Sequence, residues 1–126
     1  MEGGDYSSFI PITICTFNVH GCRGDLKQKR LANLIRSEGI DIIGMQEIDH
    51  DTASKLAGML GYGFSFAFAD YKGNALLTKF PLLDSEAITM KVDGNGEMRS
   101  AVYAHIDVPG LPRPLAVAAT HLCHRS

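Results

Sequence analysis

The sequence predicts an α/β protein with a mixed, mostly antiparallel sheet. Two observations lead to this fold class. Up to residue 61, short apolar runs alternate with two amphipathic helical patterns, which is the order of a βαβ unit. Beyond that point, short runs rich in β-branched and aromatic residues are separated by Gly, Pro and Asn-Gly turns. Such a succession is typical of antiparallel strands joined by hairpins.

Two strands are expected in the first part of the chain. Residues 10–19 are nearly all apolar or β-branched, which predicts a strand that is buried on both faces. Residues 41–47 form the second short apolar run. Because a helical pattern lies between them, the two strands should be parallel and joined by a right-handed connection.

Two helices are expected, each with a capping residue at its start and a glycine at its end. Asp25 is expected to cap a helix from Leu26 to about Glu38, which Gly39 ends. Asp51 is expected to cap the second helix, which ends at Gly61. The apolar residues at helical spacing are Leu31, Leu34, Ile35, Ala53, Leu56, Ala57 and Leu60.

Further strands are expected after the second helix, and the run Asp93-Gly94-Asn95-Gly96 is a hairpin signal between two of them. The expected strands are residues 62–68, 75–78, 87–92, 99–108 and 115–120.

Composition narrows the class of protein. The 126 residues include 12 basic and 14 acidic side chains, a net charge of −2, so a basic nucleic-acid tail and an acidic disordered tail are excluded. A local positive groove remains compatible with this balance. The three cysteines are too few for a disulfide scaffold. Residues 1–9 predict a flexible N-terminus with no secretory signal, and no apolar run is long enough to cross a membrane, which predicts a cytoplasmic location.

Polar side chains follow the two expected parallel strands. Asn18 and His20 end the first strand, and Gln46 and Glu47 end the second. The carboxyl ends of neighbouring parallel strands meet at one edge of a sheet, where α/β proteins bind ligands. Amide and carboxylate oxygens are hard ligands that suit Mg²⁺ or Mn²⁺. A solvated strand end is the alternative for Glu47 alone, and its pairing with Asn18 favours a metal site.

Three more residues are candidates, each with an ordinary alternative. His121 follows the last strand and could donate to a phosphoryl oxygen, although surface histidines are common. Arg99 opens an apolar strand and suits phosphate recognition, although taken by itself it is better explained as an exposed strand-edge charge. Asn74 follows Gly73 at the start of a strand, where the preference of turns for Gly and Asn also explains it.

Two other kinds of site are disfavoured. His121, Cys123 and His124 do not have the spacing of a four-ligand zinc site. Gly21 and Gly24 lie between a strand and a helix, but the chain has neither GxGxxG nor GxxxxGK[ST], so a dinucleotide or P-loop site is not indicated.

Five blocks in order resemble the endonuclease/exonuclease/phosphatase superfamily, over residues 10–126. They are ICTFNVHG, RLANLIRSEGIDIIGMQEID, GNALLTKFPL, EMRSAVYAHID and LAVAATHL. The resemblance implies a four-layer α/β sandwich, of which this chain would be the N-terminal half: one mixed sheet, two helices on one of its faces, and half of the active site. It implies a Mg²⁺- or Mn²⁺-dependent phosphoesterase acting on a nucleic acid, a phosphoinositide or a phospholipid headgroup.

The resemblance also implies roles for individual residues. Glu47 would be the main metal ligand, and Asn18 would line the metal and phosphate site. His121 would contact the scissile phosphate as the His of a Thr-His-Leu motif. Arg99 would support the site from a Glu-x-Arg motif, and Asn74 would contribute to catalysis.

Two family motifs do not occur in the chain, which sets the expectation for its function. These are the Gly-Asp-x-Asn and Ser-Asp-His motifs, the second of which would activate water. The sequence therefore predicts an incomplete domain that is inactive alone and exposes an apolar sheet face to its missing C-terminal half or to a second copy. The alternatives are a non-catalytic half-domain that dimerises or binds a partner, and an unrelated α/β binding protein.

Overall fold

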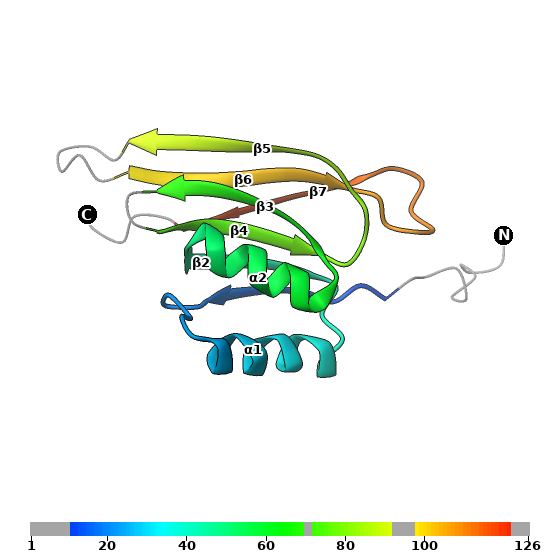
Figure 1. Ribbon diagram of the computed structural model, residues 1–126. Coiled ribbons are helices and arrows are strands. Elements are labelled where there is room, and N and C mark those ends of the chain that lie inside the picture. The colour runs from blue at the N-terminus through cyan, green and yellow to red at the C-terminus, as the bar shows by residue number, and fades with distance from the viewer. Residues whose placement is uncertain (1–10, 70–71, 92–97, 122–126) are drawn as a thin grey trace, which may run out of the picture.

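The computed structural model describes residues 11–69, 72–91 and 98–121 (Figure 1). The expected flexible segment 1–9 and the hairpin signal at 93–96 lie outside these residues. In chain order the elements are β1 (Ile14–Asn18), α1 (Asp25–Ser37), β2 (Ile42–Ile48), α2 (His50–Leu60), β3 (Gly63–Ala69), β4 (Lys72–Thr78), β5 (Leu82–Lys91), β6 (Met98–Ile106) and β7 (Leu115–Thr120).

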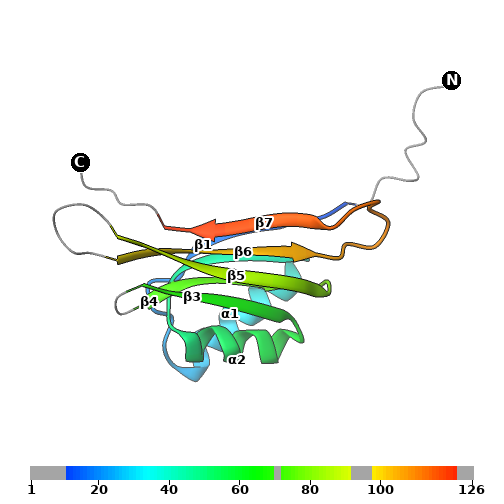
Figure 2. The ribbon, with the colours of Figure 1, turned by 90° about the horizontal axis from the view of Figure 1, so that it is seen from above.

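The elements form a layered α/β sandwich, as the sequence predicts. A four-stranded sheet has the order β1-β2-β4-β3, with β1 and β2 parallel and the other pairs antiparallel. A three-stranded antiparallel sheet has the order β5-β6-β7. Figure 2 shows α1 and α2 on one side of β3 and β4, and β5 and β6 on the other side. No helix in the described part of the chain could cross a membrane.

The expectation of a single sheet is wrong, because the strands divide between two sheets. The chain leaves the first sheet after Thr78, whose hydroxyl binds both the backbone N–H and the carbonyl of Phe80. Pro81 follows, and it cannot donate a hydrogen bond to a continuing ladder. The turn therefore sends β5 across to start the second sheet, which covers the inner face that was expected to be exposed.

Two hydrophobic cores result, one on each face of the four-stranded sheet. Alternation along β2 directs Ile43 and Met45 to the helices and Ile42 to the second sheet. The other buried residues of the helix-side core include Leu31, Ala32, Ile35, Ala53, Leu56, Ala57, Ala75 and Leu77. Those between the sheets include Leu76, Val102, Ala104, Ile106, Val108 and Ala119.

Strand β1 is shorter and more exposed than expected. It begins at Ile14, whose exposure is 55 %, and Phe17 is also exposed. The reason is position: β1 is an edge strand that pairs only with β2 among the described residues. The expectation that Leu34 belongs to the buried face of α1 is also wrong, since its exposure is 45 %.

Both predicted N-cap residues are wrong by one or two positions. Helix α1 has Gly24 at its N-cap with no side-chain capping bond, and Asp25 lies in the first turn. Helix α2 is capped by Asp49, whose carboxylate accepts the Thr52 backbone N–H at 2.7 Å. Asp51 lies inside the first turn and pairs with Lys55 at 3.1 Å. The glycines were predicted correctly: Gly39 and Gly61 adopt the left-handed backbone at the helix ends.

The capping assignment gives a stability test. We expect Asp49→Ala to lower the free energy of unfolding by about 1 kcal/mol, because the Thr52 N–H loses its acceptor. Asp51→Ala removes only an exposed pair with Lys55, which the solvent screens, and should cost clearly less than Asp49→Ala. Urea denaturation of both variants makes the comparison, and an equal loss would contradict Asp49 as the cap.

Candidate functional site

The predicted meeting of two strand ends is present in the structure. Parallel pairing places Asn18, the last residue of β1, opposite Gln46 of β2, and Glu47 follows directly. The backbone beyond β1 stays attached to β2, because the Val19 N–H donates to the Gln46 carbonyl at 3.1 Å. The parallel register therefore brings the predicted residues Asn18 and Glu47 together.

Glu47 occupies an irregular position in its strand. The pairing of β2 with β4 shifts register between Gln46 and Ile48, and Glu47 has a positive φ of 55°. A bulge of this kind inserts one residue and turns its side chain out of the regular alternation. Alternation from Ile43 and Met45 would have directed residue 47 toward the helices. Left-handed backbone at a non-glycine residue is costly, and it is concentrated at functional sites.

The loop after β1 holds Glu47 from the other side. His20, Gly21 and Cys22 all have positive φ, so the chain turns sharply there. The Gly21 N–H donates to the Glu47 carbonyl at 2.8 Å. Two irregular segments, the loop and the bulge, are thus joined by a backbone hydrogen bond.

The groups around the Glu47 carboxylate are hydrogen-bond donors and basic side chains. The Asn18 side-chain amide donates to its Oε2, and His20 Nδ1 lies 3.7 Å from its Oε1. The Asn18 bond is the largest cause that lowers the pKa of Glu47, and it outweighs partial burial, which acts in the opposite direction. His20, His121 and Lys72 lower the pKa of Glu47 further through their charges. The carboxylate is therefore ionised at neutral pH.

Asn18 is fully engaged in orienting this carboxylate. Its amide nitrogen binds Glu47, and its Oδ1 accepts the His20 backbone N–H at 3.1 Å. The structure thus places Asn18 against the candidate ligand, with its own oxygen bonded to the loop. A direct metal contact by Asn18 stays a prediction.

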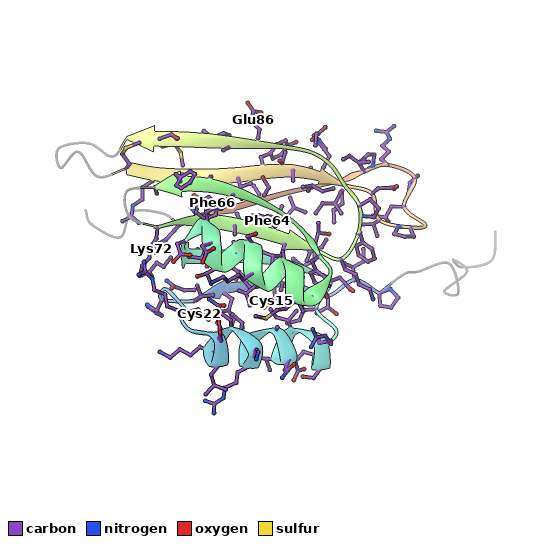
Figure 3. The ribbon with its side chains drawn as sticks, viewed as in Figure 1. Cys15, Cys22, Phe64, Phe66, Lys72 and Glu86 are labelled. Carbon is purple, nitrogen blue, oxygen red and sulfur yellow. The ribbon has the colours of Figure 1, made fainter. Side chains whose placement is uncertain are left out.

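Lys72 belongs to this cluster although the sequence reasoning did not select it. Its ammonium lies beside Gly21, where an added Cβ would come within 3.1 Å of the Lys72 Nζ. Figure 3 shows Lys72 at the end of the molecule where the loop after β1 lies. The available signal was a lysine at the start of a buried strand, Lys72-Gly73-Asn74, that antiparallel pairing places beside the end of β2.

Asn74 lies between the two sheets, with an exposure of 2 %. Its amide donates to the Ser100 carbonyl at 2.8 Å and to the Ser100 hydroxyl at 3.0 Å. The same Ser100 carbonyl accepts the Thr120 hydroxyl at 2.8 Å, and the Ser100 hydroxyl donates to the Ala67 carbonyl at 3.0 Å. This polar junction joins β4 and β3 to β6 and β7, and it holds the strand end that carries His121. A catalytic role for Asn74 stays a prediction.

Arg99 and His121 are placed differently. His121 follows β7 directly and is close enough to Glu47 to lower its pKa. Arg99 precedes the inward-facing Ser100 on β6 and pairs with Met90, so alternation directs it to the opposite face. Glu97 of the Glu-x-Arg motif and the residues Cys123 and His124 lie outside the described residues. The supporting role of Arg99 stays a prediction.

The side chains at this site supply part of the ligand set of a hard cation such as Mg²⁺. Within the described ranges no group of three or more His, Cys, Asp or Glu side chains is placed to hold a metal ion. Glu47 alone offers an ionised carboxylate, with its Oε1 facing His20 and its Oε2 bound to Asn18. One or two carboxylates together with substrate phosphate are sufficient protein ligands for Mg²⁺. The residues present therefore fit a metal ion whose remaining ligands come from other groups.

The chain belongs to the endonuclease/exonuclease/phosphatase family, whose family model matches residues 15–123. No curated protein matches it. Similar solved structures include a mannosyl-6-phosphatase of Bacteroides thetaiotaomicron (17 % identity, TM-score 0.75), which covers 92 % of this chain and 53 % of that one. The human Nocturnin catalytic domain with bound sulfate has 22 % identity and a TM-score of 0.72, and the match covers 92 % of this chain and 51 % of that one. TDP2 of D. rerio with a single-strand DNA product has 19 % identity and a TM-score of 0.71, and the match covers 90 % of this chain and 47 % of that one.

These comparisons confirm the predicted family and fold. The chain spans about half the length of the solved structures that it matches.

The hydrogen bond from Asn18 gives a test of the carboxylate. We expect Asn18→Ala to raise the pKa of Glu47 toward the ordinary glutamate value, because the ionised form loses its main donor. In the wild type this bond stabilises the fold at pH values above the pKa that Glu47 has in the unfolded chain. The contribution is lost as the pH falls through the lower pKa that Glu47 has in the folded protein. A carbon-13 NMR titration of the Glu47 carboxyl measures the shift. The matched control is Asn33→Ala on α1, and an unchanged pKa in Asn18→Ala would contradict the assignment.

The polar junction gives a second test. Ser100→Ala removes the hydroxyl that accepts from Asn74 and donates to Ala67. We expect a loss of about 1–3 kcal/mol in the free energy of unfolding, because buried polar groups remain without partners. Ser85→Ala on the exposed strand β5 is the control, measured by the same urea titration. Equal stability of the two variants would show that the junction does not hold the sheets together.

Proposed function

We propose that this chain carries the metal-binding half of a divalent-metal-dependent phosphoesterase site. The main support is the Glu47 carboxylate, which a bulge turns out of its strand and Asn18 holds in its ionised form. Membership of the endonuclease/exonuclease/phosphatase family gives the reaction class. The sulfate bound to Nocturnin and the DNA product bound to TDP2 show that similar folds take anionic ligands of this chemistry.

In this proposal the described residues have separate roles. Glu47 holds Mg²⁺ or Mn²⁺, and Asn18 is a positioning residue that fixes the carboxylate and keeps it ionised. Lys72, His20 and His121 place positive or donating groups around the phosphate. When bound, the metal ion supplies Lewis-acid polarisation of a phosphoryl oxygen. The group that activates water is proposed to come from another part of the complete fold.

The open sheet edges support completion of the fold by a second half. Strand β1 ends the four-stranded sheet and β7 ends the three-stranded sheet among the described residues. Contacts join β2 to β7, so the β1 edge and the β7 edge lie on the same side of the sandwich. One further unit could extend both sheets at once, and similar structures are about twice as long as this chain. The partner is therefore proposed to be the other half of the fold, or a second copy that substitutes for it.

Metal binding tests the proposal directly. We expect the 126-residue chain to bind Mn²⁺ weakly, and Glu47→Gln to weaken this binding by about tenfold or more, since loss of a partner of a metal ligand alone costs about 10–100-fold. The control is Glu86→Gln, an exposed carboxylate on β5 (Figure 3). Electron paramagnetic resonance of free Mn²⁺ gives the affinities, and equal binding by wild type and Glu47→Gln would contradict the ligand assignment.

Phosphodiester hydrolysis by the chain alone tests whether it carries only half of the active site. We expect the same chain to hydrolyse bis-p-nitrophenyl phosphate very slowly or not at all, because the Ser-Asp-His motif that would activate water does not occur in the sequence, and the carboxylate beside His20 is that of Glu47, the proposed metal ligand. Robust hydrolysis that disappears in Glu47→Ala would support the enzyme class and overturn the proposed incompleteness.

A further inference from the structure

Three aromatic rings are stacked and tilted against one another near the candidate site. They are His50, the first residue of α2, and Phe66 and Phe68 of β3. The His50 and Phe68 rings are nearly parallel, with an interplanar angle of 9° and centroids 6.2 Å apart. Phe66 meets both rings edge-on, at 5.4 Å from His50 and 4.8 Å from Phe68. We call these three residues the aromatic platform.

Within the platform, Phe66 is packed against the core and the Phe68 ring is exposed. Phe66 packs against the helix-side core. Gly73 of β4 leaves the space that Phe66 needs, since an added Cβ would lie 2.7 Å from the Phe66 Cζ and would overlap the Ala67 carbonyl oxygen. Phe68, which pairs across the strands with Gly73, has an exposure of 68 %. The Phe68 ring therefore contacts Phe66 and His50 while most of its surface stays open to solvent.

The platform lies at the same end of the sheet as Glu47. His50 comes three residues after Glu47, and Lys72 pairs with Ala69, the residue after Phe68. Figure 3 shows Phe66 and Lys72 toward this end of the molecule. A second cation is close to His50, because the Arg23 Nε lies 3.4 Å from the Asp49 carboxylate. The platform therefore lies at the same end of the sheet as the proposed metal site, with Lys72 and Arg23 as nearby basic side chains.

We propose that the aromatic platform stacks a base of single-stranded nucleic acid whose neighbouring phosphate lies at Lys72. This substrate class rests on the proposed function. A flat ring beside cations matches a nucleobase joined to phosphates, since every base has a π-face and stacking tolerates any sequence. A sugar phosphate has no comparable flat face. Strand β3 is the edge opposite β1, so completion of the fold at β1 and β7 would leave the platform accessible.

The experiment compares two single-stranded hexamers with equal phosphate number, one of deoxythymidylate and one without bases. Fluorescence anisotropy with the 126-residue chain is measured without divalent metal, so that neither hydrolysis nor metal loading contributes. We expect the thymidylate hexamer to bind at least about fivefold more tightly than the abasic one. Phe68→Ala and Phe68→Leu should both remove this preference, whereas Phe68→Trp should retain it. Leucine keeps apolar bulk without a ring, which separates stacking from packing.

Matched variants make the outcome decisive. Leu83→Ala, another exposed apolar residue on β5, should leave the preference unchanged. Equal binding of the two hexamers by the wild type, absence of binding, or a preference that survives Phe68→Ala would overturn the proposal. Phe68-dependent binding to phosphatidylserine vesicles without binding to the hexamer would also overturn it in favour of a membrane surface. Glu47→Gln should keep the base preference while losing Mn²⁺, so failure of the proposed function and failure of this subsite give different results.

Discussion

The geometry of the site depends on one backbone constraint, the left-handed conformation of Glu47 within the bulge of β2. Regular strand alternation would direct this side chain into the apolar layer beneath the helices, where an ionised carboxylate would be strongly disfavoured. The bulge turns the carboxylate to the end of the sheet, where Asn18 and three cationic or imidazole side chains surround it. The Gly21 N–H on the Glu47 carbonyl stabilises this conformation from the neighbouring loop.

The constraint is local, but the rest of the fold maintains it. Both faces of the four-stranded sheet are buried, so β2 cannot slide to relieve the bulge without exposing Ile42 or Ile43. The polar junction around Ser100 then fixes the second sheet to the first, and this places the end of β7 near Glu47. The second sheet thereby brings His121 close enough to Glu47 to lower the pKa of its carboxyl.

The sequence predicted the features that follow from local rules. Asn18 and Glu47 could be paired in advance, because two short apolar strands joined by a helix must be parallel and their ends must meet. Lys72 could not be found this way, since its place depends on the crossing of β4 between β2 and β3, which no turn signal reveals. The division into two sheets was also missed, because an antiparallel pattern looks the same whether successive strands share one sheet or two. The capping error at α2 has a simpler cause: Asp49 and Asp51 are both suitable caps, and only the observed backbone decides between them.

The composition of β1 and β7, the edge strands on one side of the sandwich, has a consequence for handling the protein. Edge strands usually carry charges or proline that prevent pairing with other chains, and neither β1 (ICTFN) nor β7 (LAVAAT) contains any. In strand β1, Ile14 and Phe17 also present apolar side chains to solvent. Protection against aggregation must therefore come from whatever covers these edges and not from the strands themselves. Aggregation of the 126-residue chain should rise steeply with its concentration, and a single lysine introduced at the solvent side of β1 would oppose it.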